Sequence, residues 1–325
     1  MKRNGEMKSV SAIGNIVSAI KYLYLSKNVT MNPKIANSLN TYLKGANRQR
    51  HKGVANGTLP DEYGDAPLQY DEFHALLLQT LKSGNNFSLS AFCHVFILLC
   101  YSLLARGESV SRLKTENICI ENDHININIG KSKSDPTSAR DYPRAVYSNP
   151  LDPVMDVYLA LGIYIFTQER DMNGRFLDFL FGVTPKHSNA ATSKVTNWIK
   201  SICEKAKTLD DNRAASNELF RIAQQLGDKK GLHSCRKTSA TYASAVPSIQ
   251  TLAICLRACW SVGILKRYVY QSKHNDECIG RAITGIDHGT REYSVLPAHF
   301  SNTDMLTHEF YKVIISTLCC YHMFS

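Results

Sequence analysis

The stretch from Gly231 to Arg281 decides how the rest of the chain is interpreted. It opens with GLHSCRKTSATYAS (231–244) and closes with RACWSVGILKRYVYQSKHNDECIGR (257–281). His233 and Arg236 stand three residues apart, so in a helix they lie one turn apart on one face and can point at the same object. Arginine offers a planar fork of donors suited to phosphate oxygens, and a neutral histidine can move a proton near pH 7. With a tyrosine hydroxyl nearby to attack phosphorus, these groups predict chemistry at a phosphodiester.

Each residue also has an ordinary structural interpretation. An HxxR pair is often a coincidence of helix faces or a structural ion pair. Trp260 alone is more typical of a core than of a catalytic site, and a lone tyrosine such as Tyr268 or Tyr270 is usually a half-buried packing residue. The functional interpretation therefore depends on whether the rest of the chain supplies the missing groups.

The positive charge of the chain is concentrated near its start. The formal charge is +10 over 325 residues, and residues 1–60 hold ten Lys and Arg against one acid, Glu6. The other 265 residues hold 28 basic and 27 acidic side chains. So basic a segment at residues 1–60 favours a polyanionic partner, and nucleic acid is the usual one. A solvated tail or a transport signal has the same composition. The predicted DNA contacts are Lys44, Arg48, Arg50 and Lys52.

The remaining composition is that of an ordinary soluble protein, with 44% apolar and 20% charged residues, long enough for two domains. Ten cysteines at irregular spacing predict no zinc ribbon, and those in apolar runs fit a reducing compartment. The start of the chain shows no signal peptide. The most apolar run, Phe92 to Leu104, is too short to span a bilayer, so we expect a buried helix and no membrane partner.

The first part of the chain predicts a small helical domain. Residues 7–24 carry apolar side chains at helical spacing, and Asn32-Pro33 opens a second helix to Lys44 that leads into the basic segment. Residues 53–66 hold three Gly, a Pro and three acids without an apolar face, which is typical of a linker. We place the basic, DNA-clamping domain at residues 1–60 and the linker at 61–66.

The second part, residues 67–290, predicts a mainly α fold with a small antiparallel β-sheet (α+β). A helix from Tyr70 to Gly84 precedes a run that is apolar all round from Leu89 to Ala105 and delivers Arg106. Isoleucines alternate with polar residues across a turn at 121–123, which predicts a hairpin. Further elements are a strand at 144–148, a helix at 153–168, helical spacing at 193–207 and 217–225, and a tail at 291–325 that could dock as a helix.

Taken in order, these parts resemble the tyrosine recombinases, in particular the eukaryotic Crypton-like branch found in mobile elements. The resemblance covers roughly residues 40–285 and includes the segment RAVYSNPLDPVMDVYLALGIYIF (144–166) and the trailing Gly280-Arg281. In that family an arginine follows an apolar helix, a leucine stands seven residues later, and an acid or amide and a β-branched residue follow. The matching positions are Arg106, Leu113, Asn117 and Ile118.

The other family positions also have matches. A hairpin lysine corresponds to Lys133, with Lys131 as its rival, and the HxxR motif to His233 and Arg236. The position held by His or Trp corresponds to Trp260, and the nucleophile to Tyr268, with Tyr270 as the alternative. In the family the tyrosine usually stands nine positions after the His or Trp, whereas Tyr268 stands eight and Tyr270 ten positions after Trp260. The family's acid three residues after the first arginine is Ser109 here, with Glu108 shifted by one.

The resemblance implies DNA strand exchange by two transesterifications through a 3′-phosphotyrosine. In that scheme Arg106 and Arg236 clamp the non-bridging phosphate oxygens, His233 exchanges a proton with the tyrosine, and Lys133 protonates the leaving 5′-oxygen. Trp260 can donate its indole N–H and pack the site but cannot accept a proton. The scheme requires no metal, ATP or other cofactor, in keeping with a sequence that has no Walker motif and no Asp and Glu cluster spaced for two metals.

The resemblance also implies double-stranded DNA as partner, a synaptic tetramer, often tied by an exchanged C-terminal helix for which residues 305–323 are a candidate, and a nuclear location. Two alternatives stay open: a domesticated derivative that binds DNA without cutting it, and a type IB topoisomerase-like enzyme.

Overall fold

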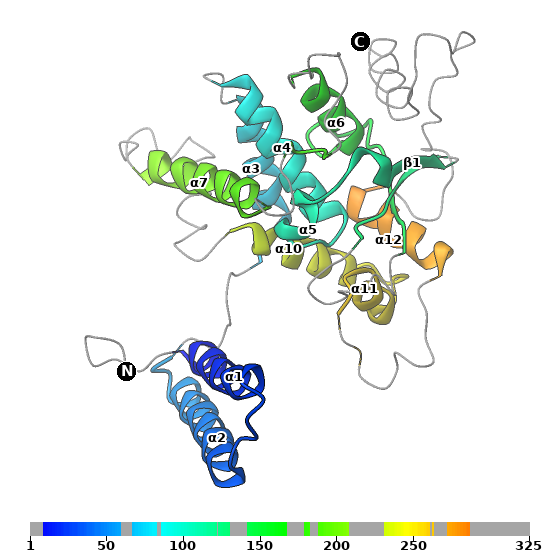
Figure 1. The fold of residues 1–325 in the computed structure, drawn as a ribbon. Coiled ribbons are helices and arrows are strands. Elements are labelled where there is room, and N and C mark those ends of the chain that lie inside the picture. Colours follow the sequence, from blue (N-terminus) through cyan, green and yellow to red (C-terminus); the bar gives the residue numbers. More distant parts are fainter. Residues whose placement is uncertain are drawn as a thin grey trace. The chain divides into compact units, whose positions relative to one another are not determined.

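The computed structural model divides the chain into two compact units, residues 1–64 and 65–325 (Figure 1). It describes residues 9–59, 67–82, 86–121, 123–130, 142–167, 179–182, 188–207, 231–260, 262 and 272–286. The predicted linker at 61–66, helix at 217–225 and tail at 291–325 are not among them.

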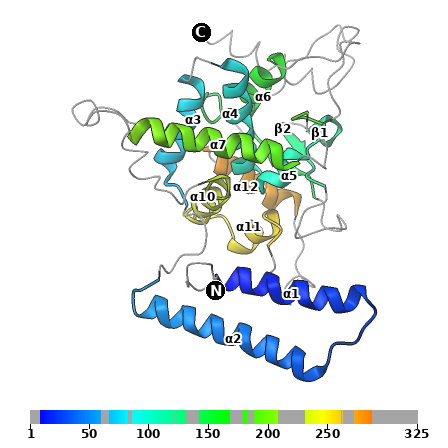
Figure 2. The same ribbon diagram turned by 60° about the vertical axis from the view of Figure 1, so that its left-hand side comes forward.

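The first unit is a pair of helices, α1 (Val10–Ser26) and α2 (Pro33–Ala55), packed side by side (Figure 2). Sequence signals fix where each begins. The Ser9 hydroxyl accepts a hydrogen bond from the Ala12 N–H, and the Asn32 side chain accepts one from the Lys34 N–H. The buried apolar residues of this unit, within its described part, are Ile13, Val17 and Ala46. Its core is therefore small.

The sequence predicts a linker that starts at Gly53. This prediction is wrong for residues 53–55, which are helical. Helix α2 continues to Ala55, and the N–H groups of Thr58 and Leu59 both bond to the Gly53 carbonyl. Gly57, at φ +68°, then adopts the left-handed conformation that glycine tolerates best. The helix therefore ends where the backbone geometry demands glycine, four residues beyond the first glycine of the segment.

Helix α4 (Phe87–Ser102) forms the centre of the second unit. Every residue from Ser90 to Ser102 is buried, which confirms the prediction of a central helix with apolar residues all round. It contacts α3 (Tyr70–Lys82), α6 (Val157–Phe166), α7 (Ser188–Lys207) and α10 (Leu232–Ser244). No helix in the described parts of the chain is long and apolar enough to cross a membrane.

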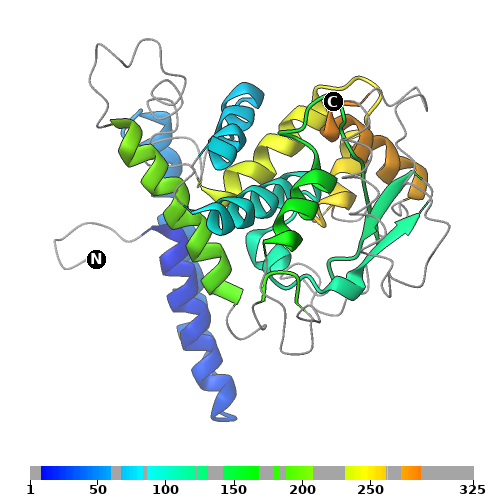
Figure 3. The same cartoon turned by 90° about the horizontal axis from the view of Figure 1, so that it is seen from above.

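A three-stranded antiparallel sheet covers one side of this unit, and α7 lies on the opposite side (Figures 1 and 3). Its order is β1 (Ile118–Glu121), β2 (His124–Ile127), β3 (Arg144–Val146). Glu121 pairs with His124 at the hairpin turn, and Ile127 pairs with Arg144. The predicted hairpin and following strand are confirmed, and so is the class, mainly α with a small antiparallel sheet.

Helix α6 begins at Val157, four residues later than predicted. The Asp156 carboxylate caps it by accepting hydrogen bonds from the N–H groups of Tyr158 and Leu159. The other carboxylate oxygen accepts from the Ser148 hydroxyl at 2.5 Å and the Asn149 N–H at 3.0 Å. The start was missed because the sequence pattern did not show that this buried aspartate serves both the helix and the loop before it.

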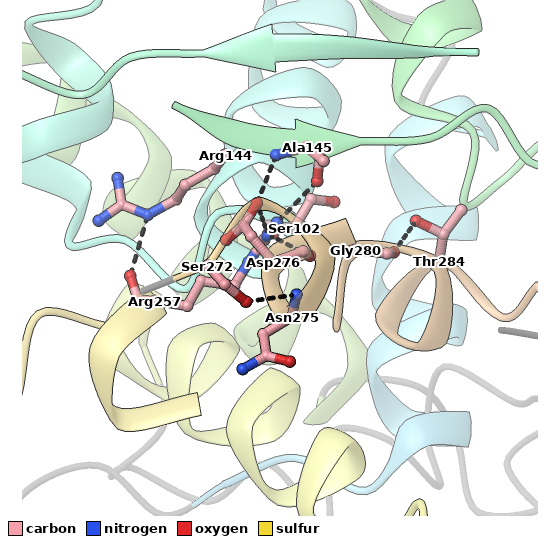
Figure 4. Close-up of polar contacts among 9 residues, drawn as sticks. All are labelled: Ser102, Arg144, Ala145, Arg257, Ser272, Asn275, Asp276, Gly280 and Thr284. Atoms are coloured by element: carbon pink, nitrogen blue, oxygen red, sulfur yellow. Dashed lines mark hydrogen bonds and ion pairs between the residues drawn. The ribbon is translucent and has the colours of Figure 1, made fainter. Parts of the chain in front are cut away.

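A buried ion pair joins α11 (Thr251–Arg257) and α12 (Lys273–Thr284) to the sheet (Figure 4). Arg257 Nη1 lies 2.6 Å from Asp276 Oδ2, which also accepts the Ala145 N–H at 2.7 Å. Arg257 Nη2 donates to the carbonyls of Ser102 and Ala145. Gly280 lets α12 approach β3, because a Cβ there would lie 2.5 Å from the Ala145 oxygen. One guanidinium thus ties together α4, β3, α11 and α12.

Replacing Arg257 with Gln is expected to destabilise the protein by about 3–5 kcal/mol, because it leaves the Asp276 carboxylate buried without its cation. Urea unfolding measures the loss. Arg112→Gln is the control, since the Arg112–Glu108 pair is partly exposed and should contribute less than about 1 kcal/mol. Equal losses for the two variants would show that the buried pair does not hold these elements together.

Candidate functional site

Arg106 follows a strained turn at the end of α4. Leu104 has φ +48°, and its N–H bonds to the Tyr101 carbonyl while the Ala105 N–H reaches back to Cys100. This is a Schellman cap with leucine at the position where glycine is usual. The left-handed conformation of a leucine costs roughly 1–2 kcal/mol. Arg106 comes two residues later, half-buried, as the residue that precedes helix α5 (Gly107–Ser111). The cap thus sets the direction in which the chain presents Arg106.

Helix α10 carries the HxxR motif, as predicted. Arg236 is 2% exposed, and its Nη2 donates to the Ala258 carbonyl. Its Nε and Nη1 are buried and have no hydrogen-bond partner among the described residues. His233, in the first turn of the same helix, is exposed. The motif therefore presents one buried cation with unused donors and one accessible imidazole.

Trp260 reaches Arg236 through a second strained cap, at the end of α11. Cys259 has φ +52°, its N–H bonds to the Leu256 carbonyl, and the Trp260 N–H bonds to the Cys255 carbonyl at 2.8 Å. The Trp260 ring then lies with its centroid 5.4 Å from the Arg236 guanidinium carbon. A ring at that distance stabilises the cation without occupying its hydrogen-bond donors.

The electrostatics of the site favour an anion. Burial, together with the nearby charges of Arg106 and Arg144, lowers the pKa of Arg236 from its usual 12.5 to about 10. Arg106 and Arg236 are 130 positions apart in the chain, yet they lie close enough for their charges to interact. A bound oxyanion would offset this repulsion and accept hydrogen bonds from Nε and Nη1 of Arg236.

The acid beside Arg106 does not take the family position. Glu108 Oε1 pairs with Arg112 Nη2 at 2.6 Å, within helix α5. Ser109 is buried, and its N–H donates to the Arg106 carbonyl. Glu108 therefore pairs with Arg112.

The remaining predicted catalytic residues, Lys133 with its rival Lys131 and Tyr268 with its alternative Tyr270, lie outside the described residues. In the sequence, Tyr268 stands four residues and Tyr270 two residues before Ser272, the N-cap of α12. The Arg257–Asp276 pair ties α11 and α12, which bracket this segment.

The sequence missed Arg144. It is the first residue of β3, is 7% exposed, and was interpreted only as part of a strand. Its charge is one of those that lower the pKa of Arg236. No local pattern could have revealed it, because its neighbours at the end of α11 are more than 110 positions further along the chain.

The predicted DNA contacts lie on α2. Lys44, Arg48 and Lys52 are exposed and four residues apart, so they form a stripe along one face of the helix, and Arg50 is half-buried. The described residues include no group of three or more His, Cys, Asp or Glu side chains that could hold a metal ion.

A search of known protein families finds no match for this chain, and a search of curated proteins finds none either. Among solved structures, a similar one is the crystal structure of the XerH site-specific recombinase bound to difH substrate, in a pre-cleavage complex. The two chains are 18% identical with a TM-score of 0.37, over 62% of this chain and 48% of that one. This chain thus matches about half the length of that recombinase, and a similarity so low does not establish a shared fold.

Proposed function

We propose that this protein cuts and rejoins double-stranded DNA through a covalent 3′-phosphotyrosine. The observation that carries the proposal is the state of Arg236, a buried guanidinium with two donor atoms that have no partner among the described residues. It lies beside the Trp260 ring and close enough to Arg106 for the two charges to interact. Fixed donors of this kind stabilise the charge that develops on phosphate oxygens during phosphoryl transfer.

In the proposed reaction the Tyr268 oxygen attacks phosphorus, and the bond from phosphorus to the 5′-oxygen breaks. The tyrosine proton passes to His233, whose exposed imidazole can exchange it with solvent. Lys133 protonates the leaving 5′-oxygen. Attack by a 5′-hydroxyl on the phosphotyrosine reverses the step and rejoins the strand, so the energy of the phosphodiester is conserved in the protein ester.

Arg106 and Arg236 hold the two non-bridging oxygens in this scheme. Arg106 precedes helix α5 and Arg236 lies within helix α10, and only the sum of their charges matches the two negative charges of the transition state. Trp260 packs against Arg236 and keeps water from the guanidinium.

The resemblance to the Crypton-like branch extends the proposal to site-specific recombination or integration of a mobile element, in the nucleus, by copies of the chain that self-associate on DNA. A fluorescent fusion tests the location, and the size of the protein–DNA complex tests the self-association.

A suicide-substrate trap tests the activity. The probe is a pool of duplexes nicked so that cleavage releases a short 5′-hydroxyl fragment, with randomised bases around the nick. The expected result is labelled DNA that stays attached to the protein in denaturing gels. Duplex binding without an adduct would instead identify a non-cutting derivative. Adducts accompanied by relaxation of supercoils without recombination would identify a topoisomerase-like enzyme.

Replacing Lys44, Arg48 and Lys52 together with Gln is expected to weaken duplex binding and to make it less sensitive to salt. Each lost phosphate contact lowers the slope of log affinity against log salt by about 1, so the triple variant should lose about 3. The control exchanges Lys for Arg and Arg for Lys at the same positions and should keep the slope. An unchanged slope in the Gln variant would exclude this stripe from the DNA interface.

A further inference from the structure

Arg144 donates hydrogen bonds to the same turn, residues 257–259, that Arg236 contacts. Its Nε donates to the Arg257 carbonyl at 2.9 Å (Figure 4). Its Nη2 donates to Cys259 Sγ at 3.2 Å. Arg236 donates to the carbonyl between them, that of Ala258. One arginine comes from strand β3 and the other from helix α10. Three consecutive residues, 257–259, are therefore bonded to both elements.

This turn is suited to hold two cations. The last four carbonyls of a helix have no partner within it, and the carbonyl end carries partial negative charge. At the end of α11 the carbonyls of Arg257 and Ala258 are satisfied by the two arginines. The left-handed Cys259 then sends Trp260 over the Arg236 guanidinium. Any movement of the turn would move both the acceptor of Arg236 and the ring that covers it.

We propose that Arg144 is a positioning residue of the phosphate site: it fixes the 257–259 turn to the sheet, so that Arg236 and Trp260 face the bound oxyanion. This inference rests on the proposed function for its role in catalysis. The anion site itself can be tested without DNA.

Arg144 is also well placed to link the site to the sheet. It begins β3, opposite Ile127 at the end of β2, and the connection between these strands contains Lys133. A shift of Arg144 would thus move both the 257–259 turn and the start of strand β3. A lysine at position 144 would keep the charge and one bond, but it lacks the fork that reaches the carbonyl and the sulfur together.

The experiment compares the full-length wild type with Arg144→Lys and Arg144→Gln. Tungstate, a phosphate analogue, is titrated into the DNA-free protein, and binding is read from the shift in melting temperature and from Trp260 fluorescence in a Trp198→Phe background. We expect tungstate affinity to fall about 10-fold for Gln and about 3-fold for Lys, a ranking that reflects the charge and one hydrogen bond. Adduct formation on the nicked pool should slow about 100-fold for Gln, with partial rescue by Lys.

The outcomes separate the two proposals. Tungstate binding and adduct rates within 2-fold of wild type for both variants would overturn the role of Arg144 alone. If tungstate binding depends on Arg144 but the wild type forms no adducts, the positioning role is supported and the cleavage reaction is overturned. A wild type that does not bind tungstate would overturn both.

Cys259→Ala tests the same inference with a smaller change, should Arg144→Gln fail to fold. It removes the sulfur acceptor of Arg144 and leaves every arginine in place. We expect tungstate affinity to fall about 3-fold in the wild-type background and not at all in the Arg144→Lys background. Equal losses in both backgrounds, or no loss in either, would contradict a positioning role for Arg144.

Discussion

Replacing Tyr268 with Phe is expected to abolish covalent protein–DNA adducts while leaving the affinity for duplex DNA unchanged. The substitution removes the oxygen that would attack phosphorus and keeps the ring. Duplex affinity depends on phosphate contacts spread over the protein, such as the α2 stripe, rather than on one phenol. The suicide-substrate trap and a gel-shift assay measure the two quantities on the same preparations.

Tyr270→Phe is the matched control for this experiment, because it makes the same chemical change two residues away. If Tyr268 is the nucleophile, Tyr270→Phe retains adducts. Adducts that survive in Tyr268→Phe and vanish in Tyr270→Phe would assign the reaction to Tyr270. Loss in both variants would show that the hydroxyls act together.

Replacing Arg236 with Gln is expected to slow adduct formation by about 100- to 1,000-fold, a loss of about 3–4 kcal/mol of transition-state stabilisation. The same variant should make the DNA-free protein more stable, by about 1 kcal/mol, since a buried charge that repels its neighbours is removed. Single-turnover trapping and urea unfolding give the two values. A variant that loses both activity and stability would mean that Arg236 is a structural residue.

The lowered pKa of Arg236 also makes the stability of the protein depend on pH. The folded pKa of Arg236, about 10, lies below the usual 12.5, so between these values the folded state binds fewer protons than the unfolded chain. The charged guanidinium therefore destabilises the fold at every pH below about 10, and this penalty is relieved as the pH rises toward 12.5. Arg236→Gln should remove this contribution to the pH dependence.

Arg257 provides the contrast for Arg236. Both guanidiniums are almost fully buried, at 1% and 2% exposure, and they lie near the same turn. Arg257 is paired with the Asp276 carboxylate, whereas the described residues provide Nε and Nη1 of Arg236 with no partner. The same Arg→Gln change is therefore expected to destabilise at one position and stabilise at the other. A common sign would contradict the distinction between a structural and a ligand-binding arginine.

Several parts of the structure were predictable from short-range patterns. The run that became α4 is apolar all round, which required burial on every side, and the alternating isoleucines of 118–129 predicted a hairpin. The HxxR spacing placed His233 and Arg236 on one helix. These predictions succeeded because helix and strand periods are properties of a few consecutive residues.

The limits of α2 and α6 were less predictable. Gly53 has the composition of a linker residue but lies within a helix that ends at Ala55, and Asp156 starts α6 because its carboxylate also satisfies the loop at 148–149. Each boundary depends on which of several suitable capping residues the rest of the fold can accommodate.

The sequence by itself determined the fold class and identified the arginines and the tryptophan as candidates for a phosphate site. Only the tertiary structure brought Arg144 to the end of α11, buried Arg236 beside Trp260, and left two of its donor atoms without a partner among the described residues. The reason is physical. Side-chain periodicity acts over one or two turns, whereas the charge and hydrogen-bonding state of a buried group depend on every segment that packs around it.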